Sequence, residues 1–103
     1  MISTCVLVGR IAELPAKIEE GQYKGEYGMV IEVDRPFMNM DGSLTKDHFF
    51  VRLWRGIAEQ CCDTCTLDSI VAIRGRLESM NKEGFACSVI AEKVSFIYCK
   101  TEG

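Results

Sequence analysis

The sequence predicts an all-β domain, a small five-stranded barrel with one short helix between the third and fourth strands. Five short stretches alternate in polarity with a period of two, which is the period of a β-strand. Residues 56–66 instead place apolar side chains at helical spacing. A chain of 103 residues forms one domain, residues 1–103, with a single modest core.

The first two strands are predicted at Cys5–Ile11 and Glu26–Arg35. The near-continuous apolar character of the first indicates burial on both faces, and Gly9 inside it indicates a bend or bulge. Residues 12–25 are predicted to be a connection, because Pro15 and two glycines interrupt them. The apolar face of the second strand comprises Tyr27, Met29, Ile31 and Val33.

The third strand, residues 47–55, is the most informative stretch. Pro36 ends the strand before it, and Asp41-Gly42 predicts a hairpin turn between the two. Three alternate residues form an ordinary core face: Phe49, Val51 and Leu53. The opposite face carries His48, Phe50, Arg52 and Trp54. Rings beside a cation suit stacking on nucleic-acid bases with phosphate contacts, and they also suit a protein–protein interface.

The remaining elements are the helix, a fourth strand at Ile70–Leu77, and a fifth strand region at 85–98 with a break near 91–93. In the fourth strand Val71, Ile73 and Leu77 are predicted to point inward, and Arg74 and Arg76 outward. Glycines 9 and 75 lie in similar apolar settings, where they let coiled strands turn a corner. This order of elements predicts the OB-fold, whose second and third strands and adjoining loops bind oligonucleotides.

The charge balance argues against a generic polyanion binder. Twelve Lys and Arg stand against 15 Asp and Glu, for a net charge of −3, although a local stripe can be positive on an acidic protein. Exposed arginines paired with carboxylates are the alternative to phosphate contacts; phosphate contact is favoured for Arg52, Arg74 and Arg76. No signal peptide and no membrane-spanning apolar run is found, which predicts a cytoplasmic protein without membrane contact.

The six cysteines are interpreted as free thiols of a reducing cytosol. Cys61, Cys62 and Cys65 have helical spacing, which favours packing against the barrel over a zinc site or a redox pair. No nucleophile motif, phosphate-binding glycine loop or paired-carboxylate arrangement stands out. We therefore expect no catalysis, no metal and no cofactor.

Six stretches together resemble the bacterial single-stranded DNA-binding protein family, in order and in spacing. They are residues 6–11, 33–37, 49–55 with 57–59, 69–71, 74–77 and 89–94. The resemblance covers nearly the whole chain. It implies an OB-fold, a homotetramer or a dimer, and single-stranded DNA wrapped over the barrels during replication, recombination and repair.

Carried over by position, the resemblance places the family's stacking rings at Phe37, His48, Trp54 and near Lys82. Two of these depart from the pattern, because His48 stacks more weakly than a hydrocarbon ring and Lys82 replaces a ring. Phe85 or Met80 is a candidate to compensate. The residues expected to contact DNA are Arg10, Arg35, Phe37, His48, Phe50, Arg52, Trp54, Arg55, Arg74, Arg76, Lys82 and Phe85.

Family members commonly end in a flexible segment with an acidic tip that recruits replication and repair proteins, and this sequence stops at Gly103 without one. The resemblance is therefore to a tail-less relative, such as mobile-element versions or the primosomal replication protein B, or to a shortened chain. The alternative function is an OB-fold adaptor that binds a protein partner through the same face, with weak nucleic-acid binding. An RNA-binding OB domain is the third alternative.

Overall fold

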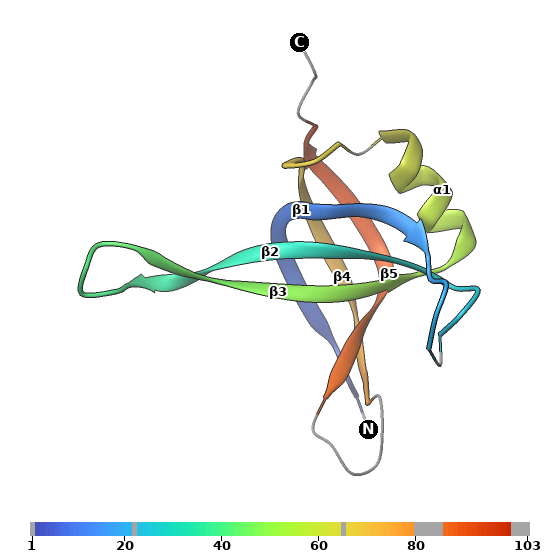
Figure 1. Cartoon of the computed structure of the whole chain (residues 1–103), viewed down its shortest axis with the longest axis horizontal. Helices are drawn as coiled ribbons and strands as arrows, with labels where there is room; N and C mark the ends of the chain where they lie inside the picture. Colours follow the sequence, from blue (N-terminus) through green and yellow to red (C-terminus); the bar gives the residue numbers. More distant parts are fainter. Residues whose placement is uncertain (1, 22, 65, 80–85, 100–103) are drawn as a thin grey trace.

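The computed structural model describes residues 2–21, 23–64, 66–79 and 86–99. Within them the chain forms five strands and one helix (Figure 1). The elements are β1 (Cys5–Lys17), β2 (Tyr27–Met38), β3 (Leu44–Leu53), α1 (Arg55–Thr64), β4 (Ile70–Ser79) and β5 (Cys87–Tyr98).

The strands close into a barrel in the order β1-β2-β3-β5-β4. All neighbours are antiparallel except β3 and β5, which run parallel. The strand β1 closes the barrel because residues 5–10 pair with β4, while residues 10–17 pair with β2. The predicted barrel and the position of its helix are confirmed.

The strand β1 is longer than predicted. It continues to Lys17 through the stretch expected to be a connection, and Pro15 lies within it at a register shift between Glu13 and Ala16. Proline is tolerated in a strand where the ladder is already interrupted. A bulged strand can bend sharply, and this bend carries β1 from one side of the barrel to the other (Figure 1).

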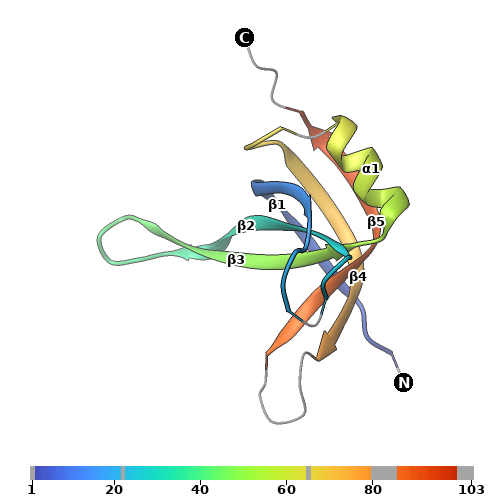
Figure 2. The same cartoon turned by 45° about the vertical axis from the view of Figure 1, so that its right-hand side comes forward.

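The hairpin of β2 and β3 extends past the barrel as a long arm, which both views show (Figures 1 and 2). The strand β2 continues beyond Pro36 to Met38, contrary to the prediction that the proline ends it, and a register shift separates Asp34 from Met38. The predicted turn at the tip is confirmed, since Gly42 has a positive φ of 88°.

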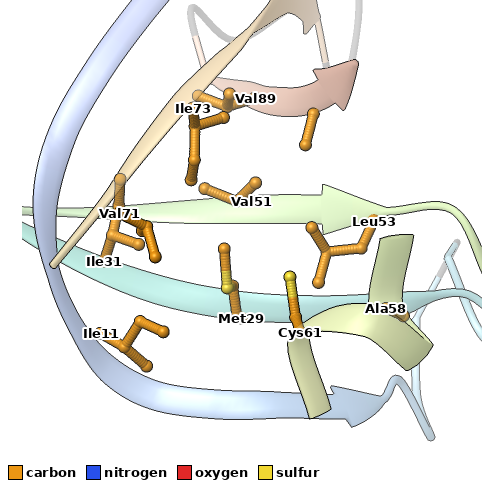
Figure 3. Packing of buried hydrophobic residues seen from close by; sticks show 11 residues of the cluster. Ile11, Met29, Ile31, Val51, Leu53, Ala58, Cys61, Val71, Ile73 and Val89 are labelled. Carbon is orange, nitrogen blue, oxygen red and sulfur yellow. The ribbon is translucent and has the colours of Figure 1, made fainter. Parts of the chain in front are cut away.

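The core fills the barrel from all five strands and the helix (Figure 3). The predicted inward faces of β2 and β3 are confirmed by residues such as Met29, Ile31 and Val51, each at most 1% exposed. The helix α1 lies against β1 and β2, and its Cys61 and Ala58 point toward this core (Figure 3). Cys61 is therefore a packed core thiol, as predicted.

Two predictions of burial are wrong. Val6 and Val8 of β1 are 63% and 51% exposed, because only the inward alternate residues of this strand meet the core. Leu77, predicted to point inward, is 47% exposed. The pairing of β1 with β4 begins at Cys5 opposite Gly75, so Leu77 lies beyond the closed part of the barrel.

The break expected in the fifth strand is a bulge. Arg74 pairs with Lys93 and Gly75 pairs with Ala91, which leaves Glu92 as the additional residue. Among the described residues the strand begins at Cys87; the predicted start at residue 85 lies outside them. In the described part of the chain, no helix is long and apolar enough to cross a membrane.

Candidate nucleic-acid interface

The outer face of the β2–β3 ribbon brings together three of the predicted side chains. Register pairs Val30 with Phe50 and Glu32 with His48, and Arg52 follows on the same face by alternation. This face, defined by His48, Phe50 and Arg52 with their β2 partners, is the surface that the sequence singled out.

Phe50 lies over a glycine of the neighbouring strand. A Cβ at Gly28 would come within 2.5 Å of the Phe50 Cζ and 3.4 Å of the Ile18 Cδ1. Because Gly28 has no side chain, the Phe50 ring can occupy the space above it. Phe50 remains 39% exposed, so part of the ring is open to a ligand.

Trp54 lies just after β3, in the link to α1, rather than within the strand as predicted. Its side chain is 63% exposed and borders a hollow of about 420 Å³. The residues that line this hollow are Lys17, Gly25, Glu26, Tyr27, Leu53, Trp54 and Arg55. An exposed ring thus stands beside two cationic side chains, which is the arrangement that base stacking with phosphate contact requires.

Glu32 organises the middle of the ribbon. Its carboxylate lies 3.1 Å from Arg10 Nη2, 3.2 Å from Lys46 Nζ and 3.3 Å from His48 Nε2. Hydrogen bonds from Arg10 and then Lys46 lower the pKa of Glu32. Arg10 also bonds Asp34 at 3.0 Å. The predicted contact residues Arg10 and His48 are therefore held by carboxylates in the unbound protein.

Arg35 lies on the other side of the ribbon from His48 and Phe50, because it alternates in phase with the inward residues of β2. Its guanidinium makes two hydrogen bonds to Asp47, from Nε at 3.0 Å and from Nη2 at 2.9 Å. This pair lowers the pKa of Asp47. The sequence did not anticipate that Arg35 and the aromatic face would be separated.

Arg52 is the most enclosed of the predicted contacts, with a side chain only 12% exposed. Nη2 donates to Glu26 at 2.7 Å, Nη1 donates to Glu78 at 3.0 Å, and the guanidinium carbon lies 3.7 Å from the ring centroid of Tyr23. Burial lowers the pKa of Arg52, but the two carboxylates outweigh burial and raise it. We call Arg52, Tyr23, Glu26 and Glu78 the Arg52 clasp.

The remaining arginines are dispersed. Arg74 and Arg76 are exposed on β4, as predicted, but β5 separates that strand from β3. Arg76 bonds Glu78 at 3.1 Å, which connects it to the clasp. Arg55 begins α1 and pairs with Glu59 one helical turn later at 3.2 Å.

Phe37 stands near the tip of the arm and is 67% exposed, far along the ribbon from Trp54. Lys82 and Phe85, together with Met80, lie outside the described residues. The predicted rings that are described, Phe37, His48, Phe50 and Trp54, therefore lie along β2–β3 and at its end, while the predicted arginines are dispersed around them, rather than forming one compact patch.

Sequence reasoning missed two residues of this surface. Lys17 borders the hollow beside Trp54 and forms no ion pair with any described residue, while Tyr23 stacks on Arg52. The available signal was one aromatic residue in an otherwise polar, glycine-containing connection between β1 and β2.

Metal chemistry receives no support from the described residues, where no group of three or more His, Cys, Asp or Glu side chains is placed to hold an ion. The only histidine, His48, is engaged with Glu32. Cys65 and the Cys62 side chain lie outside the described part of the structure.

A closed five-stranded barrel, with its helix between the third and fourth strands and rings along the second and third, defines an OB-fold with the kind of face that binds oligonucleotides. Among OB-fold proteins, the chain is similar in sequence to curated single-stranded DNA-binding proteins. The chain is 29% identical over 97% of its length to the single-stranded DNA-binding protein of Oceanobacillus iheyensis. It is 28% identical over 94% of its length to single-stranded DNA-binding protein B of Bacillus subtilis.

The chain covers 66% of the Oceanobacillus relative and 91% of the Bacillus subtilis one. No family model matches the sequence. The resemblance to the bacterial single-stranded DNA-binding proteins is nevertheless confirmed over nearly the whole chain by these relatives.

Solved structures agree on the fold. The small single-stranded DNA-binding protein of Streptomyces coelicolor superposes with a TM-score of 0.63 at 18% identity, covering 93% of this chain and 94% of that one. The mitochondrial single-stranded DNA-binding protein of S. cerevisiae gives 0.70 at 11% identity, covering 96% and 97%. Identities this low establish the OB-fold alone.

Proposed function

We propose that this protein binds single-stranded DNA without sequence preference, in DNA replication, recombination and repair. The observation that carries the proposal is the line of exposed rings along β2–β3, namely Phe37, Phe50 and Trp54. Every base has a π-face, so such a line accepts any sequence. The relatives in Oceanobacillus iheyensis and Bacillus subtilis, both named single-stranded DNA-binding proteins, support the same ligand.

Trp54 is the principal stacking residue in this proposal. It is exposed, it stands at the hollow beside Lys17 and Arg55, and base stacking contributes about 1–3 kcal/mol per base. A base on the indole places its phosphates near these two cations. Lys17 has no ion pair with a described residue that must be broken before it binds, in contrast to Arg10 and Arg35.

A fluorescence titration with oligo-dT at two salt concentrations tests the proposal. Trp54 is the only tryptophan, so quenching reports directly on the proposed stacking site. The apparent affinity should fall with salt, because phosphate neutralisation releases counterions. Binding of a labelled oligo-dT by Trp54→Ala, followed by anisotropy, should weaken about 5- to 150-fold, the equivalent of about 1–3 kcal/mol. If oligo-dT at low salt neither quenched Trp54 fluorescence nor shifted the protein in a gel, the proposal would be refuted.

Homo-oligomerisation is part of the proposal. The outer faces of β1 and β5, the strands on either side of β4, expose Val6, Val8 and Ile97 at 51–63%. Exposed apolar residues gathered on one face mark a contact surface. A second copy of the chain covers this face in our proposal, as a dimer or within a tetramer, and leaves the ribbon free for DNA.

The second candidate function is a protein-binding adaptor. The observation that favours it is the pairing of Arg10, Arg35 and Arg52 with carboxylates in the unbound protein, together with the net charge of −3. Salt-insensitive binding of a replication protein, with no effect of oligo-dT as competitor, would favour the adaptor. Matched RNA and DNA oligomers in competition distinguish an RNA ligand.

A further inference from the structure

Arg52 joins three parts of the chain that are distant in sequence. Glu26 and Tyr23 belong to the connection between β1 and β2, Arg52 itself belongs to β3, and Glu78 lies near the end of β4. Because β5 lies between β3 and β4, the bond to Glu78 crosses β5. Ser88, the β5 residue that pairs with Glu78, is 1% exposed. The Arg52 clasp therefore attaches residues 18–26 to strands β3 and β4 of the barrel.

The backbone hydrogen bonds that the described residues of the connection 18–26 make all lie within that connection. Ile18 N–H donates to the Glu26 carbonyl at 2.7 Å, and Gly25 N–H donates to the Ile18 carbonyl at 2.9 Å. Gly21 and Gly25 adopt positive φ values of 88° and 95°. Glycine is the least restricted residue in the unfolded chain, so a segment built on two of them gains order from an external attachment. The stacked and doubly bonded guanidinium supplies that attachment.

The bonding of Arg52 also argues against a phosphate contact. Both terminal nitrogens are engaged by carboxylates, and one face of the guanidinium is covered by Tyr23. Two carboxylates surround one guanidinium, so an approaching phosphate meets negative charge first. A phosphate contact would require breaking bonds to charged groups, which are stronger than neutral ones.

The attached segment forms one wall of the hollow beside Trp54, to which it contributes Gly25 and Glu26, next to Lys17. We propose that Arg52 is a positioning residue: it holds the connection 18–26 so that this hollow keeps its shape, and it does not itself bind DNA. The proposal rests on the proposed single-stranded DNA binding for its effect on affinity, but its structural part stands without DNA.

Hydrogen exchange on the unbound protein tests the structural part. In Arg52→Lys the charge remains, but the two-armed bonding is lost, so the amides of Ile18 and Gly25 should exchange about tenfold faster. Amides in the β1–β4 ladder, such as that of Leu7, should keep their protection. Tyr23→Ala should reproduce the effect, and Tyr23→Phe, which keeps the ring, should not.

Anisotropy with labelled oligo-dT tests the functional part. Arg52→Lys and Tyr23→Ala should each weaken binding about three- to tenfold. The loss of affinity in the double variant should not exceed the product of the two single losses, because both changes release the same segment. The slope of affinity against salt concentration should stay unchanged. A slope reduced by about 0.7 in Arg52→Gln, with exchange at Ile18 and Gly25 unchanged, would show a phosphate contact and overturn the proposal. If the unaltered protein binds no oligo-dT, the proposed function fails, while the exchange result still decides whether the clasp orders the segment.

Discussion

Phe50 occupies the space that any side chain at Gly28 would need, since a Cβ there would lie 2.5 Å from the ring. Gly28→Ala must therefore displace the ring from the β2–β3 face. We expect a loss of about 1–3 kcal/mol in the free energy of unfolding, as in other overpacked sites, and weaker oligo-dT binding. Urea unfolding and anisotropy measure the two effects.

A double variant separates this clash from a general sensitivity of β2. In the Phe50→Leu background the alanine at position 28 meets a smaller side chain, so its cost should fall well below the cost in the original protein. An equal cost in both backgrounds would show that Phe50 does not fill this space.

Asp47→Asn should strengthen DNA binding. The Asp47 carboxylate holds Arg35 with two hydrogen bonds, and its loss frees the guanidinium for phosphate. Exposed pairs contribute about 0–1 kcal/mol, so stability should change little. The salt slope of oligo-dT affinity should steepen by about 0.7, the value for one phosphate on a single strand.

Asp63→Asn is the matched control for this change, because it removes the same charge from α1, where Asp63 forms no ion pair with a described residue. An equal gain in both variants would indicate a general effect of net charge. It would remove Arg35 from the proposed interface.

Acid should destabilise the protein partly through Glu32. Arg10 and Lys46 lower the pKa of this carboxyl in the folded state, so its contribution is fully present above the unfolded pKa, about 4.3 for a glutamic acid. The contribution is lost as the pH falls from there through the lowered folded pKa. Glu32→Gln should flatten the decline of stability in this acid window.

Thermal unfolding between pH 7 and pH 3 measures this dependence. Glu13→Gln serves as the control, since Glu13 makes no ion pair with the described residues. A Glu32→Gln profile parallel to that of the unaltered protein would mean that the Arg10–Glu32–Lys46 group does not survive in solution.

Val8→Arg should dissociate the proposed oligomer. Val8 is half exposed on β1, opposite Ala72 of β4, and burial of a valine contributes about 1.5–3 kcal/mol in each copy. Light scattering should show a reduced mass. Met40→Lys, at the fully exposed tip of the arm, should leave the mass unchanged, and an unchanged mass in Val8→Arg would place the contact elsewhere.

Alternation in the sequence predicts this fold well, because the inward faces of β2 and β3 follow directly from a period of two. The period does not tell whether an outer face is covered or exposed, and so Val6 and Val8 were wrongly expected to be buried. The same limitation applies to Leu77, whose exposure depends on where β1 begins beside β4.

The charges of the candidate site were less predictable than its rings. Exposure of Trp54 and Phe37 follows from their place at the end of a strand and near a hairpin tip. The partners of Arg52 are each 26 residues away or more. Tyr23 and Glu26 lie in the connection between β1 and β2, and Glu78 lies on β4, which β5 separates from β3. No local pattern carries that information, because it arises only when the barrel closes.

At Gly75 the packing of β4 against β5 in the closed barrel leaves no room for a side chain. A Cβ there would collide with the backbone carbonyl of Ile90 on β5, beside the bulge at Glu92. A carbonyl in the ladder cannot rotate away as a side chain can, so Gly75→Ala should cost more than the roughly 1–3 kcal/mol typical of overpacking. Gly56→Ala, in the first turn of α1 with nothing within 4 Å, should be neutral or more stable by up to about 1 kcal/mol. Urea unfolding of both variants measures the difference, and equal stability would contradict the close approach of β4 and β5 at this point.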